Sequence, residues 1–406
     1  MEVNYDQLGL AQQLLARQAD SHLSSMRSYL TQFCTIEQGD LGLILYALKP
    51  LADLSVTLGT GAIDIAASLA TASAEAVTAT IDEYIASDKE AADAANAMAV
   101  ALGGSAIPFV DPRGSVPTLG DSESSAPYVD SWDGGEKWMY EQAIDEATDF
   151  REGVLDRIDT AADRIGAWSG GAGAVVERDD PSSYLDLPMA NDAAIEDVRW
   201  SAGPLIGGID WVFEEITGIS IMEDYITKPL AGNWTAIDKA SSAWANLGGA
   251  SLAIGKNFSA LPGQTESWTG GAADQFRVSM AAMGGAFVGL SYAFEYVSGL
   301  ASTISAISNF AAGLIASALE AIAAKLLRMA AEACVPVIGW AVAAAEIGIM
   351  VVDIIQNLLT VYKVCNMIMD AVYDFVEAKG KLVDVAFIIE DLVQGFTRST
   401  VRSMTA

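Results

Sequence analysis

Few residues in this chain have the type and spacing that catalysis needs. His22 is the only histidine in 406 residues, and a Ser/His or Cys/His nucleophile would have to use it. Because His22 lies on an expected helix beside polar residues, we predict that it is exposed on the surface and not catalytic. The sequence contains no P-loop, no H-E-x-x-H motif and no dinucleotide-binding fingerprint after a strand.

The acidic residues and the cysteines do not form a recognisable site either. Acidic pairs such as Glu214–Glu215 are plentiful, but in a chain with 53 acidic and 22 basic residues they are typical of solvated helix faces. Cys34, Cys334 and Cys365 are far apart and no C-x-x-C spacing occurs, so the sequence predicts neither a zinc site nor a disulfide framework. We therefore expect a protein that is not an enzyme and that binds no metal and no cofactor.

One pair of side chains has the spacing of a recognition surface. Tyr84 and Asp88 are four residues apart in DEYIASDKEAADA, residues 82–94, which is expected to be helical. On a helix this spacing places the phenol and the carboxylate on the same face, one turn apart. The pair is therefore predicted to form a small docking surface.

A second motif places a tryptophan beside two glycines, in ESWTGGAADQF at residues 266–276. Glycine adopts backbone conformations closed to other residues, so Gly270 and Gly271 favour a tight turn between two helices. Thr269 is suited to cap the second helix, and Trp268 is expected to bury its ring against both helices or against a partner that completes the bundle. Taken alone, the motif is also typical of an ordinary capped turn with a buried tryptophan.

Long helices must position both motifs. Over residues 3–33, apolar residues recur every three or four positions and line one face of an expected helix. The residues of this stripe are Leu8, Ala11, Leu15, Ala19, Leu23, Met26, Leu30 and Phe33. A second helix is expected from about Pro50 to Met98, loosened at TLGTG, residues 57–61. The two helices are separated by a short break at 35–42 and predict a helical hairpin.

The rest of the chain continues this pattern. Residues 103–127 are rich in Gly, Pro and Ser, and they predict a linker or an extended surface strap. An amphipathic helix is expected over 144–168, another from Trp234 to about Leu261, and further helical residues over 272–328 and after Val337.

We therefore predict an all-α protein of long helical hairpins, packed as an extended four-helix-type bundle with an additional apolar helical C-terminal region. The expected regions are an N-terminal hairpin with the Tyr84 motif (1–100), a linker (101–135), an amphipathic helix and its connecting loop (136–204), a Trp-x-Gly hairpin (205–330), and apolar then amphipathic C-terminal helices (331–406).

Composition and charge limit the partners. Apolar residues make up 52% of the chain and charged residues 18%, which is enough to bury a large core. The net charge of −31 would repel a phosphate backbone, so we expect no nucleic-acid binding, whereas solubility and a basic partner are compatible with it. The N-terminal MEVNYDQLGLAQQ has neither a basic nor an apolar signal region, which predicts no Sec-type signal peptide.

Two apolar stretches in the C-terminal half allow two interpretations. Residues 296–319 contain no charge and are long enough to span a bilayer, but Ser, Thr, Asn and Gly dilute them. Residues 334–352 are more apolar and carry Glu346. The two stretches are either a pair of membrane-inserting helices or part of a bundle core, and the buried core is the favoured interpretation.

The triplet Trp268-Thr269-Gly270, with long helices on both sides, resembles the Trp-x-Gly (WXG) superfamily of type VII (ESX) secretion substrates, whose members are helical hairpins with this motif at the bend. The resemblance covers residues 205–300 and, loosely, 335–346.

The pair Tyr84 and Asp88 is similar to the Y-x-x-x-D/E export signal of type VII substrates, which lies just beyond a hairpin in the EspC-like family. Simple members of the superfamily pair two hairpins as a dimer, with Trp-x-Gly on one partner and the export tyrosine on the other. In this chain both features occur together, so they either pack in an intramolecular four-helix arrangement or each recruit a separate partner. The further triplets that begin at Trp132 and Trp168 are expected to be fortuitous.

The resemblance implies a type VII substrate, or a secretion-associated protein, that is exported folded and acts at the cell envelope or outside the cell by protein assembly or membrane contact. Its implied partners are the secretion ATPase and a small WXG partner or chaperone, with self-assembly as a further expectation. Two alternatives from other classes stay open. One is a pore-forming or membrane-remodelling effector that uses residues 296–352, and the other is an acidic cytosolic escort of a basic protein.

Overall fold

The computed structural model describes residues 3–43, 45–124, 174–190 and 232–333, together with Leu359 and Asn366. Of the interpretable residues, 78% are helical, and no strand occurs among the residues that the structure describes. The predicted all-α class is therefore confirmed for this part of the chain.

The first helical rod covers Tyr5 to Phe33, as the periodicity predicts. It comprises helix α1 (Tyr5–Arg17), the π-helical segment η1 (Gln18–Leu23) and helix α2 (Ser24–Phe33). The side chain of Asn4 caps its start by accepting hydrogen bonds from the backbone N–H groups of Asp6 and Gln7. The predicted apolar stripe lies in the core from Leu8 to Leu30, and Phe33 is partly buried against it.

Helix α4 (Lys49–Ala101) follows two short elements, α3 (Gln38–Leu41) and η2 (Tyr46–Leu48). The predicted loosening at 57–61 is wrong, because α4 runs through these residues without a break. At Gly59, an added Cβ atom would lie 2.9 Å from Leu30 Cδ1 and 3.1 Å from Trp244 Cη2. Gly59 therefore allows the neighbouring helices to pack closely against α4. From the sequence alone, a glycine with this role cannot be distinguished from one that breaks a helix.

Two further long helices lie side by side. Helix α9 (Trp234–Gln264) and helix α10 (Gly271–Ala333) are joined by the turn at 265–270. Aromatic pairs link the two helices, with ring centroids 5.5 Å apart for Trp244 and Phe294 and 5.3 Å apart for Phe258 and Phe287. Such pairs add about 0.5–1.5 kcal/mol each beyond the burial of their area.

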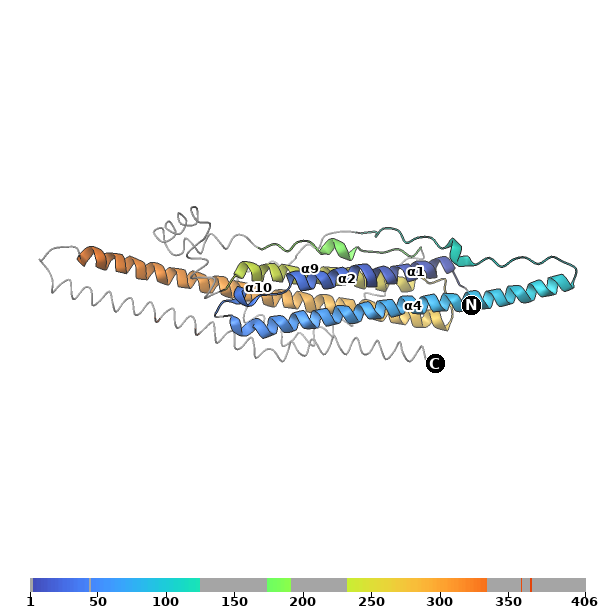
Figure 1. The fold of residues 1–406 in the computed structure, drawn as a ribbon, viewed down its shortest axis with the longest axis horizontal. Coiled ribbons are helices and arrows are strands. Elements are labelled where there is room, and N and C mark those ends of the chain that lie inside the picture. The colour runs from blue at the N-terminus through green and yellow to red at the C-terminus, as the bar shows by residue number, and fades with distance from the viewer. Residues whose placement is uncertain are drawn as a thin grey trace.

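The long helices run along a common axis (Figure 1). Helix α1 packs on α4, α2 contacts both α4 and α9, and α9 packs on α10, so the described helices share one apolar core. The C-terminal end of α4 extends past the other described helices at one end of the molecule, and α10 extends past them at the other (Figure 1).

Extended segments cover α1 and α9 on one side (Figure 1). The described part of the predicted linker, residues 103–124, makes a short turn at η3 (Pro112–Ser115), and its residues after that turn are held along α1 as a strap. Gln13 Nε2 donates to the carbonyl of Pro117 at 3.0 Å, and Arg17 Nη1 donates to the carbonyl of Gly120 at 2.8 Å. The segment 174–190, with η4 (Pro181–Tyr184), then contacts α9.

Several predicted features fall on residues that the structure does not describe. The amphipathic helix at 144–168, the triplets at Trp132 and Trp168 and the stretch at 334–352 lie outside the described residues. The beginning of the apolar stretch at 296–319 is described. There Ser305 Oγ donates to the carbonyl of Trp234 at 2.9 Å, and the neighbouring Leu300, Ala301, Ile304 and Ala312 are buried.

The described helices differ in whether their length and composition would allow them to cross a membrane. One of them, Tyr46–Ala101, is long and apolar enough to cross a bilayer, and 28% of its most apolar window is buried within the protein. A buried core helix of a soluble protein has the same length and composition, so these properties alone are weak evidence for a membrane span.

Candidate recognition site

The tryptophan of the Trp-x-Gly motif lies in the turn between α9 and α10. Its side chain is 2% exposed and packs on Phe276 of α10, with ring centroids 5.4 Å apart. Gly270 has a φ of 118°, a left-handed conformation that strongly favours glycine. Arg277 of α10 donates to the carbonyls of Thr265, Glu266 and Trp268 and fixes the turn against the helix that follows it.

The two predicted motifs meet at this turn. The Nε1–H of Trp268 donates to the hydroxyl of Tyr84 on α4, with 3.3 Å between the nitrogen and the oxygen. One turn further along α4, the carboxylate of Asp88 accepts a hydrogen bond of 2.6 Å from the hydroxyl of Tyr5 on α1. We call these four residues, Tyr5, Tyr84, Asp88 and Trp268, the Trp268 cluster. It joins three segments of the chain.

A further contact ties the turn to the first helix. The hydroxyl of Ser267 hydrogen-bonds the side chain of Gln7 on α1. Burial, with the hydrogen bond to Asp88 and its charge, raises the pKa of the Tyr5 phenol, so Tyr5 stays protonated and remains a donor at neutral pH. Tyr84 is half-buried and Asp88 is exposed, so the carboxylate is the more accessible part of the predicted signal.

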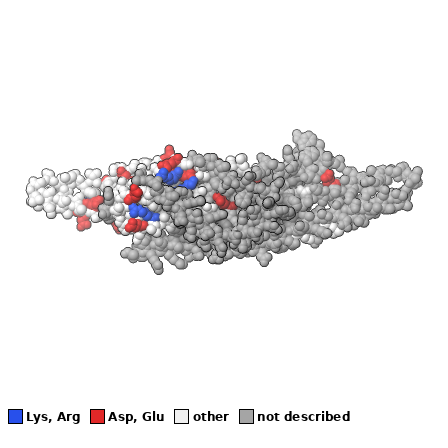
Figure 2. Space-filling view, turned by 180° about the vertical axis from the view of Figure 1, so that it is seen from behind, with Lys and Arg blue, Asp and Glu red and all other residues white. Residues whose placement is uncertain are grey.

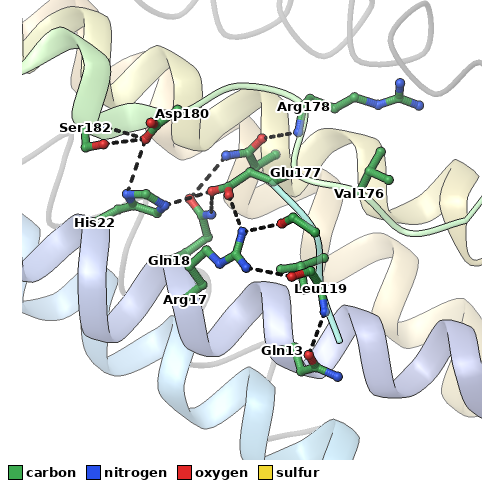
Figure 3. A network of polar contacts seen from close by, with 12 residues as sticks. Gln13, Arg17, Gln18, His22, Leu119, Val176, Glu177, Arg178, Asp180 and Ser182 are labelled. Carbon is green, nitrogen blue, oxygen red and sulfur yellow. Dashed lines mark hydrogen bonds and ion pairs between the residues drawn. The ribbon is translucent and has the colours of Figure 1, made fainter. Parts of the chain in front are cut away.

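A second group of polar residues was not predicted and lies under the extended segments (Figure 3). Glu177 is 2% exposed, accepts hydrogen bonds from Arg17 at 2.8 Å and Gln18 at 2.7 Å, and lies 2.8 Å from His22 Nε2. Burial alone would raise the pKa of the Glu177 carboxyl, but the contacts from His22, Arg17 and Gln18 outweigh it and lower the pKa below its usual value.

The prediction that His22 is exposed is wrong, because its residue is only 7% exposed. Its polar neighbours on the helix indicate a solvated face, but residues 174–180 cover that face and supply the Glu177 carboxylate. A covering segment from so far along the chain gives no local signal in the helix itself. The prediction that His22 is not part of a nucleophile system remains a prediction.

The same extended segment is also held by α9. Asp179 is 2% exposed, lies 2.7 Å from Lys256 Nζ and accepts a hydrogen bond of 2.9 Å from the hydroxyl of Tyr184. Asn257 accepts hydrogen bonds from the backbone N–H groups of Arg178 and Asp179 and donates to the carbonyl of Asp179. We call residues 174–184 with these partners on α1, η1 and α9 the clasp.

The remaining thiol and carboxylate groups of the described residues can be placed as well. Cys34 is buried, and burial raises the pKa of its thiol well above the usual value, which keeps it in the unreactive neutral form. Within the described ranges, no group of three or more His, Cys, Asp and Glu side chains is placed to hold a metal ion. The clasp is a set of buried carboxylates facing basic groups, whereas the Trp268 cluster presents a carboxylate to solvent.

Comparison with known proteins does not assign a family. No protein-family model, no curated protein and no solved structure matches this chain.

Proposed function

We propose that this protein is a non-enzymatic substrate of a type VII (ESX) secretion system, or a protein associated with that secretion, and that it acts at the cell envelope or outside the cell. The observation that carries the proposal is the contact between Trp268 and Tyr84. These residues belong to the two motifs that resemble the parts of a type VII signal, and they are 184 positions apart in the sequence.

The arrangement of the helices is part of the proposal. The rod of α1 and α2 with α4 forms one hairpin, α9 with α10 forms the second, and the two pack as an extended four-helix-type bundle. The packing of α1 on α4, of α2 on α9 and of α9 on α10 supports this arrangement. Of the two alternatives left open by the sequence, the contact of Trp268 with Tyr84 supports the intramolecular one.

Such an arrangement has a consequence for recognition. In the simple family members, two chains must associate before the turn and the export tyrosine are adjacent. Here one chain brings them together, so the secretion ATPase is expected to read a composite surface of Asp88 and the neighbouring turn without a WXG partner. A chaperone and self-assembly then act at other surfaces.

The export test uses Asp88→Arg. Asp88 is exposed and accepts a hydrogen bond from Tyr5, so reversing its charge is expected to abolish export while the purified protein stays folded. The measurement is the amount of protein in the culture filtrate of a strain with a type VII system and of the same strain without the type VII ATPase. Circular dichroism of the purified variant checks the fold.

A matched control lies on the same helix. Glu75→Arg makes the same charge reversal at another exposed position of α4, away from the Trp268 cluster, and is expected to leave export unchanged. Normal export of Asp88→Arg rejects the signal assignment. If the natural chain stays in the cytosol of a secretion-competent strain, the whole proposal fails and the acidic escort is favoured instead.

A further inference from the structure

The end of α4 and the loop that follows it expose an unusual set of apolar side chains. We call residues 94–110 the apolar tip. The large apolar side chains that it exposes are Met98 (68%), Val100 (55%), Leu102 (82%), Ile107 (76%) and Val110 (80%). Single exposed apolar residues are common on protein surfaces, but five within one short segment indicate a contact site.

Hydrogen bonds within the tip fix its backbone and keep these side chains exposed. The N–H groups of Leu102, Gly103 and Gly104 donate to carbonyls of the last helical turn, and Gly103 has a φ of 84°, which ends the helix. The side chain of Asn96 then clips the returning loop, because it donates to the carbonyl of Ile107 at 2.7 Å and accepts from the N–H of Ile107 at 2.8 Å.

The base of the tip is anchored separately. Arg113, just beyond the tip, pairs with Asp111 and donates to Asp82 of α4 at 2.9 Å, which holds the returning strap on the helix. The loop is therefore attached at Asn96 and again at Asp82. Met98, Val100 and Leu102 lie beyond the attachment at Asn96, at the projecting end of the helix, and they are 55–82% exposed.

The tip combines its exposed apolar side chains with an absence of charge. Every residue from Ala94 to Val110 is uncharged, in a chain with 53 acidic and 22 basic residues. In Figure 2, which views the molecule from behind, the projecting end formed by α4 carries neither acidic nor basic side chains, and acidic side chains begin where it joins the body. Glu90 and Asp93 precede the tip and Asp111 follows it.

We propose that the apolar tip inserts into the surface of an uncharged lipid bilayer. Apolar side chains that enter the interfacial region need to penetrate only about 5–10 Å, and a projecting end that exposes apolar groups on the helix and on the returning loop suits this geometry. The hydrogen bonds within the tip satisfy carbonyls of the last helical turn, namely those of Met98, Ala99 and Val100, so their transfer out of water costs less than that of free carbonyls.

Other occupants fit the observations less well. A standard protein interface uses about 20–30 residues on each side, whereas the tip exposes five large apolar side chains. A second copy of the chain, packed tip to tip, would bring the acidic residues at the base of each tip together and would oppose two chains of net charge −31. The same charge repels an anionic membrane, so neutral lipid is the surface that the tip selects.

The test is vesicle flotation of the full-length purified protein. It is expected to float with vesicles of phosphatidylcholine and to float less as phosphatidylglycerol is added at low ionic strength. The tip variant Met98→Ser/Leu102→Ser/Ile107→Ser is expected to bind at least ~10-fold more weakly, because three solvent-facing apolar groups no longer enter the lipid. These side chains are already exposed, so the fold is expected to survive.

A matched control changes exposed apolar residues elsewhere. Leu43→Ser/Leu187→Ser/Met189→Ser replaces side chains that are 72%, 76% and 80% exposed outside the tip, and is expected to bind as the natural chain does. The proposal is overturned if the natural chain does not bind phosphatidylcholine, if anionic lipid strengthens binding, or if the control loses as much binding as the tip variant. It is also overturned if the tip instead mediates dimers, seen by light scattering and lost in the tip variant.

This inference goes beyond the proposed export function and does not depend on it. The tip variant keeps Tyr84, Asp88 and Trp268, and its binding is read on purified protein, whereas export is read in the culture filtrate. Failure of one proposal therefore leaves the other standing.

Discussion

The clasp and the Trp268 cluster both join segments that are far apart in the sequence, but they do so with opposite chemistry. In the clasp, the carboxylates of Glu177 and Asp179 are buried, and each faces a basic side chain. In the cluster, the buried group is the indole of Trp268, and the one charged group, Asp88, is exposed. Charged groups are therefore buried in the clasp and exposed in the Trp268 cluster.

This difference indicates different roles. Burying an ion is unfavourable unless a partner compensates for lost hydration, so the charges of the clasp are committed to holding residues 174–184 in place. In the cluster, packing of the indole supplies the stability, and the exposed carboxylate stays available to a second molecule. Substitutions in the clasp are therefore expected to change stability. In the Trp268 cluster, substitution of the indole is expected to change stability and substitution of Asp88 to change recognition.

Removing the indole should have the largest effect on stability. Trp268→Ala leaves a cavity next to Phe276 and removes the contact with Tyr84, so we expect the free energy of unfolding to fall by about 3–5 kcal/mol. Urea unfolding followed by circular dichroism measures the loss. Trp268→Phe keeps most of the ring volume and should lose clearly less. A loss below ~1 kcal/mol for Trp268→Ala would show that packing of the indole does not stabilise the cluster.

The contribution of the clasp to stability should depend on pH. Because the pKa of Glu177 in the folded protein is below its usual value of 4.5, the ionised carboxylate stabilises the fold above that pH, and this contribution is lost as the pH falls through the folded pKa. Glu177→Gln is expected to lower the free energy of unfolding by about 1–3 kcal/mol at neutral pH. The difference from the natural chain should shrink below pH 4.5, as measured by urea unfolding at several pH values. A difference that stays constant with pH would contradict the charged clasp.

The sequence predicts the helices of the described part well, because their apolar residues repeat with the period of a helix. The first rod, α9 and the start of α10 follow from that period, and the turn at Trp268 follows from the two glycines after it. The clasp does not follow, since Glu177 and His22 are brought together by a covering segment with no periodic pattern of its own. The unbroken course of α4 through Gly59 was missed for a related reason: only the neighbouring Leu30 and Trp244 explain that glycine.

The smallest effect on stability is expected for the hydrogen bond between Tyr5 and Asp88 in the Trp268 cluster. Tyr5→Phe removes only the hydroxyl that donates to the exposed Asp88 carboxylate, so the free energy of unfolding should fall by no more than about 1 kcal/mol. Export should be unchanged, because Tyr84 and Asp88 are both kept and the carboxylate gains freedom to meet a partner. The measurements are urea unfolding and the culture-filtrate assay, with Asp88→Arg as the comparison. Tyr5→Phe could instead block export as fully as Asp88→Arg while the protein stays folded. The secretion machinery would then recognise the carboxylate only in the orientation that Tyr5 gives it. Asp88 would no longer be a freely available group, and the proposed separation between packing by the indole and recognition by Asp88 would be wrong.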